Sequence, residues 1–180
     1  MTHPYAKANI REIYPIRLDL APSLRLYAIW GTDKYDQDFL VKRGRKIVLF
    51  RTYRGMRSFA AAHFPGLVLE PGCTPFRISS CRKAIERQKQ QTAEAIDTFN
   101  LFFDMLKTLG IPIPEQDALY RFADYATFRH DLAPFFKGNP GITAEQLLRF
   151  VDWCTGVWLN HAIISDPAPQ VPDFQKVEKS

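Results

Sequence analysis

The order of hydrophobic patterns along the chain predicts an α+β fold, with an N-terminal, mostly antiparallel sheet packed against a C-terminal layer of about three helices. Segments that alternate apolar and polar residues occupy the first 78 positions, and segments with helical periodicity follow from residue 79. The apolar content of 46% is sufficient for a buried core. At 180 residues, the chain has the length of one domain.

The domain is expected to cover residues 10–164, with a strand-rich half (10–78) and a helical half (79–164). Residues 1–9 are expected to form a flexible arm. Residues 165–180 are rich in proline and are expected to form a flexible tail.

The strand-rich half contains one clear strand and one hairpin. Residues 24–30 (LRLYAIW) give the clearest strand pattern, because their even-numbered side chains are apolar and share one face. Residues 38–42 and 46–53 are two further predicted strands. The segment Arg43-Gly44-Arg45 between them is typical of a hairpin connection.

A short helix is expected after this hairpin, because the apolar period changes from two to helical. Gly55 predicts a turn, and Pro65-Gly66 predicts the end of the helix. The intervening apolar side chains have the spacing of one helical face: Met56, Phe59, Ala60 and His63. Arg51, Arg54 and Arg57, which recur at every third position, are therefore expected on different elements and not in a single stripe.

The helical half is expected to contain three main helices. A serine at position 79 or 80 can cap a long helix that ends at about Leu109. A second helix is predicted over residues 115–129, with Leu119, Phe122 and Ala126 buried. Thr143 and Gln146 have the spacing of a capping box for a last helix that ends at about Ile164.

The charge is divided between the two ends of the chain, although the formal net charge is only +5. Residues 1–90 contain 17 Lys and Arg against 7 Asp and Glu, a net charge of +10. Residues 91–180 contain 7 against 12, a net charge of −5. This division predicts that the two halves face different partners or each other.

The acidic half contains the first candidate binding surface. On the long predicted helix, Asp97, Asn100 and Asp104 fall at i, i+3 and i+7 and form a polar strip on an otherwise apolar segment. On the next helix, Asp117, Asp124 and Asp131 are seven residues apart and are expected on one face. Such a surface can receive a basic protein through charge complementarity. The predicted partner-binding residues are Asp97, Asn100, Asp104, Asp117 and Asp124.

The basic half contains the alternative candidate, a nucleic-acid interface. Its arginines can contact phosphates, and nearby aromatic rings can stack on bases. The arginines are Arg43, Arg45, Arg51, Arg54 and Arg57, and the aromatic residues are Tyr27, Trp30 and Tyr53. A solvated hairpin whose arginines pair with the acidic half would account for the same pattern without nucleic acid.

The sequence contains no motif that predicts catalysis, a metal or a cofactor. It lacks C-x-x-C, H-E-x-x-H and the glycine-rich phosphate loops. Cys154 lies on the apolar face of the last predicted helix, where a cysteine is usually a small buried hydrophobe. We therefore expect a non-enzymatic protein, although an active site assembled only in the fold leaves no linear pattern.

Cysteine usage and hydropathy predict a cytoplasmic protein without membrane contact. The three cysteines show no disulfide framework, so the thiols are expected to be reduced. No apolar run reaches the roughly 18 residues of a transmembrane helix, and the first residues lack the apolar region of a secretory signal.

One segment also resembles a known family. The segment FNLFFDMLKTLG (Phe99 to Gly110) follows a strand-rich half that contains IVLFRTYRGMRSF. This combination resembles small bacterial immunity proteins of the contact-dependent growth inhibition type, which carry an Asn-Leu-Phe-x-Asp-like segment on a helix after a small sheet. The matching residues are Asn100 and Asp104, and Phe99 replaces the family's Trp. The resemblance implies a cytosolic, non-catalytic protein that binds and neutralises a toxin domain.

Overall fold

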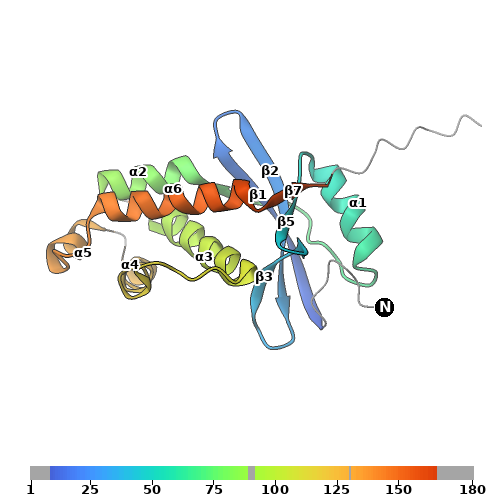
Figure 1. The fold of residues 1–180 in the computed structure, drawn as a ribbon, viewed down its shortest axis with the longest axis horizontal. Helices are drawn as coiled ribbons and strands as arrows, with labels where there is room; N and C mark the ends of the chain where they lie inside the picture. Colours follow the sequence, from blue (N-terminus) through green and yellow to red (C-terminus); the bar gives the residue numbers. More distant parts are fainter. Residues whose placement is uncertain (1–8, 89–91, 130, 166–180) are drawn as a thin grey trace, which may run out of the picture.

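The computed structural model describes residues 9–88, 92–129 and 131–165. The expected arm and tail therefore lie almost entirely outside the described residues. A mixed, mostly antiparallel sheet of seven strands lies in the N-terminal part, and the C-terminal helices extend from one face of it (Figure 1). The predicted α+β class is confirmed.

The sheet has an antiparallel centre, to which two further strands pair in parallel. The strand order is β4-β5-β2-β1-β6, with β3 paired to β2 and β7 paired to β5. The pairs β1–β6 and β5–β7 are parallel, and the other strand pairs are antiparallel. The strands are β1 (Ile10–Ala21), β2 (Leu24–Asp33), β3 (Asp38–Leu40), β4 (Lys42–Arg43), β5 (Lys46–Phe50), β6 (Thr74–Arg77) and β7 (Ala162–Ile164).

The alternation in β2 directs its side chains to the two faces of the sheet, as predicted, and the structure shows a separate core on each face. Leu26 and Ala28 belong to the core beneath the C-terminal helices, whereas Ile29 belongs to the core beneath α1 (Tyr53–His63). The apolar run 47–50 of β5 is buried at every position. A strand that is apolar at every position fits a sheet covered on both faces, and here α1 covers one face and the C-terminal helices cover the other.

Helix α1 begins earlier than the sequence pattern predicts. β5 ends at Phe50, and the Thr52 hydroxyl accepts a hydrogen bond from the Gly55 backbone N–H at 3.0 Å, which caps the helix. Gly55 is thus a buried residue inside the first turn and not a separate turn. As a consequence, Arg54 and Arg57 lie on the same helix, whereas they were expected on different elements.

Five helices form the C-terminal layer within the described residues, where about three were expected. The predicted long helix is divided into two, because Gln88 adopts a left-handed conformation (φ 52°) and its N–H bonds to the Ala84 carbonyl. The helices are α2 (Ile78–Arg87), α3 (Thr92–Leu109), α4 (Gln116–Phe128), α5 (Ala133–Gly138) and α6 (Ala144–Asn160).

Aromatic rings of α3 form the centre of the helical layer. Phe99 and Phe102 are fully buried. The ring of Phe99 lies 4.9 Å from Phe122 of α4 and 5.3 Å from Phe150 of α6. The segment predicted to be apolar around most of its circumference is therefore buried, and it joins three helices into one core.

The chain returns to the sheet after α6. The last helix was expected to continue to about Ile164, but it ends at Asn160, and β7 then adds to β5. The His161 carbonyl accepts a hydrogen bond from the Ile47 N–H at 2.7 Å. The β-branched pair at 163–164 favours a strand over a helix, and β5 supplies the partner. Among the described helices, none has the length and hydrophobicity needed to cross a membrane.

Candidate functional site

A groove between the start of α4 and the first half of α6 is the candidate binding site. It has a volume of about 520 Å³, which lies in the range of small-molecule and peptide-anchor pockets. Its apolar wall is continuous with the helical core. The apolar lining residues are Pro112, Pro114, Ala118, Leu119, Ile142, Leu147, Phe150 and Trp153.

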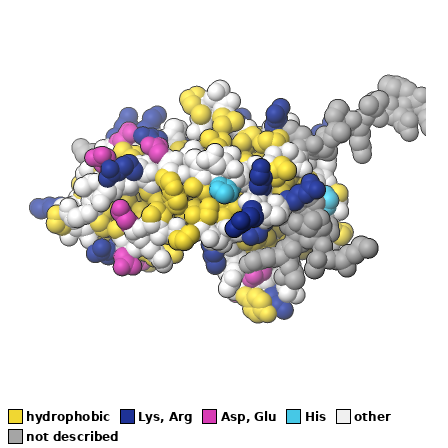
Figure 2. All heavy atoms as spheres, viewed as in Figure 1, with side chains coloured by type: hydrophobic (Ala, Val, Ile, Leu, Met, Phe, Trp, Pro, Cys, Tyr) yellow, Lys and Arg dark blue, Asp and Glu magenta, His cyan; other side chains and the backbone are white. Residues whose placement is uncertain are grey.

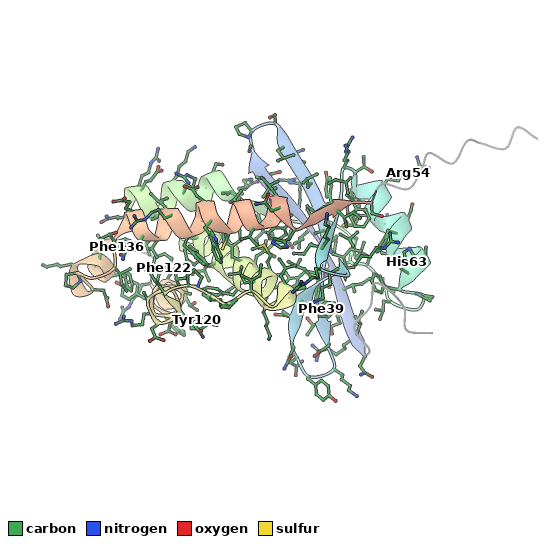
Figure 3. The ribbon with its side chains drawn as sticks, viewed as in Figure 1. Phe39, Arg54, His63, Tyr120, Phe122 and Phe136 are labelled. Carbon is green, nitrogen blue, oxygen red and sulfur yellow. The ribbon has the colours of Figure 1, made fainter. Side chains whose placement is uncertain are left out.

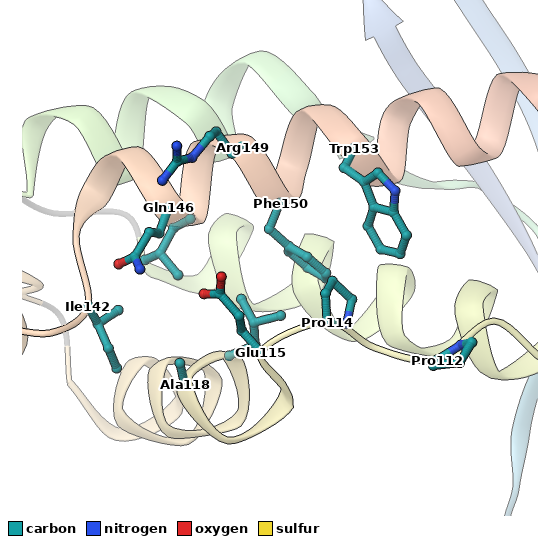
Figure 4. A pocket seen from close by; sticks show the side chains of 11 residues that line it. Pro112, Pro114, Glu115, Ala118, Ile142, Gln146, Arg149, Phe150 and Trp153 are labelled. Carbon is teal, nitrogen blue, oxygen red and sulfur yellow. The ribbon is translucent and has the colours of Figure 1, made fainter.

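Trp153 makes this groove distinctive. It lies on α6 one turn after Phe150, with its ring 6.0 Å from the Phe150 ring. Phe150 is buried, but 39% of Trp153 is exposed. Figure 4 shows both side chains directed from α6 toward the connection that precedes α4, and Figure 2 shows a hydrophobic band in this part of the surface.

Three polar residues complete the lining: Glu115, Gln146 and Arg149. The Gln146 side chain already has a partner within the fold: its Oε1 accepts a hydrogen bond from the Thr143 N–H in the predicted capping box. The Arg149 guanidinium lies 3.7 Å from the Glu145 carboxylate. Glu115 precedes α4 in a left-handed conformation (φ 47°), and its carboxylate makes no capping hydrogen bond.

The predicted acidic strip on α3 is not uniform. Asp97 and Asn100 are exposed, whereas Asp104 is half-buried against β3. Burial, and then the nearby charge of Asp38, raises the pKa of Asp104 to about 7, although Lys107 and the Trp30 indole N–H oppose this rise. Asp104 is thus part of the junction between the helical layer and the sheet.

Further contacts fix this junction between α3 and the sheet. The Thr108 hydroxyl accepts a hydrogen bond from the Leu40 N–H at 3.1 Å, and the Lys42 ammonium donates to the Thr108 carbonyl. The Thr32 hydroxyl donates to Asp38 at 2.7 Å. Cations near the last carbonyls of a helix are favourable because of the helix dipole, so Lys42 has a structural role at the end of α3.

The predicted acidic face of the second helix is shorter than expected. Asp117 and Asp124 are exposed on α4 and form no ion pair within the described part of the chain. Asp131 does not share their helix, because α4 ends at Phe128. Its carboxylate instead accepts a hydrogen bond from the Ala133 N–H at the start of α5.

The predicted arginines lie in the strand-rich half and do not line the groove. Arg43 and Arg45 lie at the β4–β5 hairpin, Arg51 follows β5, and Arg54 and Arg57 lie on α1; all five are exposed. Figure 3 shows Arg54 on α1, beyond the sheet, and Figure 2 shows Lys and Arg side chains gathered in this region.

The aromatic residues proposed for base stacking do not form one platform. Tyr27 and Tyr53 contact each other on the α1 side, with ring centroids 6.1 Å apart. The Tyr53 hydroxyl donates a hydrogen bond to the Gly72 carbonyl at 3.0 Å. Trp30 lies on the other face of the sheet, packed against Phe76. The fold therefore separates Trp30 from the two tyrosines.

The cysteines lack the features of nucleophiles. Burial raises the pKa of the Cys73 thiol to about 11 and raises the pKa of the Cys154 thiol further. Thiolates are the reactive form of cysteine, so both side chains are held in the unreactive form. Among the described residues, no group of three or more His, Cys, Asp or Glu side chains is placed to hold a metal ion.

The groove residues were not predicted from the sequence. The helical periodicity of the sequence after Thr143 predicts one face that contains Leu147, Phe150, Val151, Cys154, Trp158 and His161. The first five are buried, whereas His161 lies just beyond the end of α6 and is only half-buried. Trp153 lies outside that face, and a large aromatic residue beside a predicted buried stripe was the available signal. The connection 110–115 has no periodicity, so its contribution to a groove wall could not be read from the sequence.

The fold and the groove define an α+β protein whose helical layer carries an apolar groove. No protein-family model and no curated protein matches the chain. Among solved structures, the fold is similar to the crystal structure of the SatS C-terminal domain in complex with bromine, with a TM-score of 0.50 and 11% sequence identity. The match covers 85% of this chain and 94% of that chain. At this identity, the similarity shows a common fold.

Proposed function

We propose that the chain is a non-enzymatic, cytoplasmic protein that binds another protein, and that its partner is a bacterial toxin domain that it neutralises. The observation that carries the proposal is the apolar groove with an exposed Trp153. On the solvent side of α4, which forms one wall of the groove, Asp117 and Asp124 form no ion pair within the described residues. Exposed tryptophan is enriched at the energetically dominant positions of protein interfaces.

The charge of α4 supports a basic partner. Exposed carboxylates attract a basic surface during encounter and help to orient it. The resemblance of residues 99–110 to immunity proteins supports a toxin domain as that surface. A protein that neutralises a toxin domain by covering its active site needs affinity and shape complementarity. It needs no catalytic group of its own.

The first test is capture of the tagged protein from its native cells, followed by identification of the bound protein and measurement of its affinity in purified form. We expect a 1:1 complex and restored growth when the chain is co-expressed with a toxic partner. Absence of a stoichiometric protein partner, or a partner whose toxicity persists in the complex, contradicts the proposal.

The charge contribution is tested with a double variant of α4. Asp117→Lys/Asp124→Lys is expected to weaken binding by roughly tenfold or more and to lower the association rate, because both charges face the partner. The matched control is Glu70→Lys/Glu86→Lys, which makes the same change in net charge at two exposed carboxylates away from α4. Equal affinities for the two variants would remove α4 from the interface.

A nucleic-acid-associated function is the alternative, supported by the exposed cations at the β4–β5 hairpin and α1. It predicts binding to single-stranded nucleic acid that weakens steeply as salt increases. Arg45→Ala/Arg54→Ala/Arg57→Ala should reduce both the affinity and its salt dependence. Binding that is absent at low ionic strength, or unaffected by this variant, rejects the alternative.

A further inference from the structure

The groove between α4 and α6 is a preformed anchor site for one large apolar side chain. Phe150 and Leu147 are buried in its floor and hold α6 against the core, so these residues need no rearrangement before binding. Pro112 and Pro114 restrict the backbone of the opposite wall. A site whose walls are already ordered loses little conformational entropy when a ligand enters.

The charge around this apolar floor is unbalanced. The Arg149 guanidinium is neutralised by Glu145 on the preceding turn of α6, at 3.7 Å. Glu115 has no such partner among the described residues. Figure 4 shows its carboxylate directed from the start of α4 toward α6, across the groove. The groove and its edge therefore carry two carboxylates against one guanidinium.

The conformation of Glu115 supports a role outside the fold. A left-handed conformation costs a non-glycine residue about 1 kcal/mol or more, and the Glu115 carboxylate does not offset this cost by capping α4. The Glu115 carbonyl accepts hydrogen bonds from the Ala118 and Leu119 N–H groups at the start of α4. The Glu115 carboxylate makes no capping bond and no ion pair with the described residues, so it is available at the edge of the groove.

We propose that this groove binds a protein segment that presents a large aliphatic or aromatic side chain next to a lysine or arginine. The apolar side chain fills the space beside Phe150 and Trp153, and the cation pairs with Glu115. This inference rests on the proposed protein-binding function and specifies the partner's chemistry. An acidic segment would meet an uncompensated carboxylate at the edge of the groove, which selects against it.

Two synthetic peptides test the proposal. Both carry a Leu-Phe-Leu core, one flanked by lysines and the other by glutamates. The readout is the indole N–H signal of Trp153 in two-dimensional NMR, assigned with Trp153→Phe, together with dissociation constants from titration. The lysine-flanked peptide should shift this signal and bind about tenfold more tightly, a difference of about 1.4 kcal/mol.

Variants at the groove separate its apolar and charged parts. Glu115→Gln should bring the two dissociation constants close together and leave binding in place, whereas Trp153→Ala should weaken binding of both peptides. The controls are Glu70→Gln and Val68→Ala, which alter an exposed carboxylate and an exposed apolar side chain elsewhere. Neither control should change the dissociation constants.

Several results would overturn the proposal. These are equal affinities of the wild-type protein for the two peptides, an unmoved Trp153 signal, or a preference that Glu115→Gln leaves intact. A dimer of the free protein that dissociates in Trp153→Ala would identify a second copy of the chain as the occupant. If the purified natural partner binds with full affinity to Trp153→Ala and Glu115→Gln, the groove inference fails and the protein-binding function stands. If no protein partner exists, the function fails as well.

Discussion

Two half-buried carboxylates, Asp19 and Asp104, have opposite surroundings. Asp19 lies near the end of β1 among three arginines: it accepts hydrogen bonds from Arg17 at 3.0 Å and Arg25 at 3.1 Å, and Arg77 lies 3.9 Å away. Burial acts to raise the pKa of Asp19, but the hydrogen bonds and charges of Arg17 and Arg25 outweigh it and lower the pKa. The strand-rich half thus balances its own buried acid.

Asp104 lacks an equivalent set of cations. Burial and the charge of Asp38 raise its pKa to about 7. The Trp30 indole nitrogen, although buried, makes no hydrogen bond of normal geometry. In the sheet, arginines compensate the negative charge of Asp19. At the junction between the sheet and the helical layer, the surroundings of Asp104 favour the protonated carboxyl instead.

The largest expected effect is at Asp19. Asp19→Ala leaves two hydrogen-bonded arginines without their acceptor, and the Arg17 Nε is already buried without a partner. The loss should lower the free energy of unfolding by about 2 kcal/mol, as for other hydrogen bonds to charged groups. Urea denaturation at pH 7 measures it. The control Asp36→Asn removes the charge of an exposed ion pair with Arg11 and suits the left-handed backbone at this position (φ 58°). It should cost about 0.5 kcal/mol; equal losses would contradict the comparison.

The second effect concerns pH and Asp104. Because its folded-state pKa of about 7 lies above the ordinary value of 3.8, the folded state binds a proton that the unfolded state has released at intermediate pH. The stability from this proton is fully present below about pH 4 and is lost as the pH rises through 7. Asp104→Asn removes this dependence.

Urea denaturation from pH 4 to pH 8 measures the change. At pH 8, Asp104→Asn should be more stable than the parent protein by about 1 kcal/mol, after allowance for solvent screening. The gain should become small toward pH 4, because the folded carboxyl is protonated there and the unfolded one is partly protonated. A gain of the same size at all pH values would show that the substitution acts through packing.

The third effect isolates the charge of Asp38. Asp38→Asn retains an oxygen that can accept from Thr32 and removes the charge near Asp104. The pKa of Asp104 should then fall toward its ordinary value, as followed by NMR titration of the carboxyl carbon. Asp36→Asn, the same change two residues earlier in the β2–β3 connection, serves as the control and should leave the titration unchanged. An unchanged titration in Asp38→Asn would leave burial as the sole cause.

The smallest effect concerns Cys73, which is influenced by the same arginine cluster. Its pKa is raised to about 11, mainly by burial; the charge of Arg17 acts to lower it and the charge of Asp19 acts to raise it. Alkylation by iodoacetamide at pH 8 should be markedly slower than for a cysteine peptide, and Asp19→Asn should accelerate it slightly. Alkylation of Cys73 at the peptide rate would show that its environment is open to solvent.

Local sequence patterns were sufficient for most elements of this protein. The alternation of residues 24–30 assigned side chains to the two faces of β2, and the capping box of Thr143 and Gln146 located the start of α6. These features depend on neighbours within one helical turn or one strand pair, which is why the sequence determines them.

Tertiary structure decided where helices stop and which surfaces meet. The sequence pattern did not identify the break at Gln88, and it predicted helix where the chain returns as β7, because both depend on partners distant in the sequence. The groove follows the same rule, since Glu115 and Trp153 lie on separate elements that the core brings together. Asp104 was recognisable as a polar residue on an apolar helix, but its raised pKa depends on burial against β3 and on Asp38, and therefore only the fold determines it.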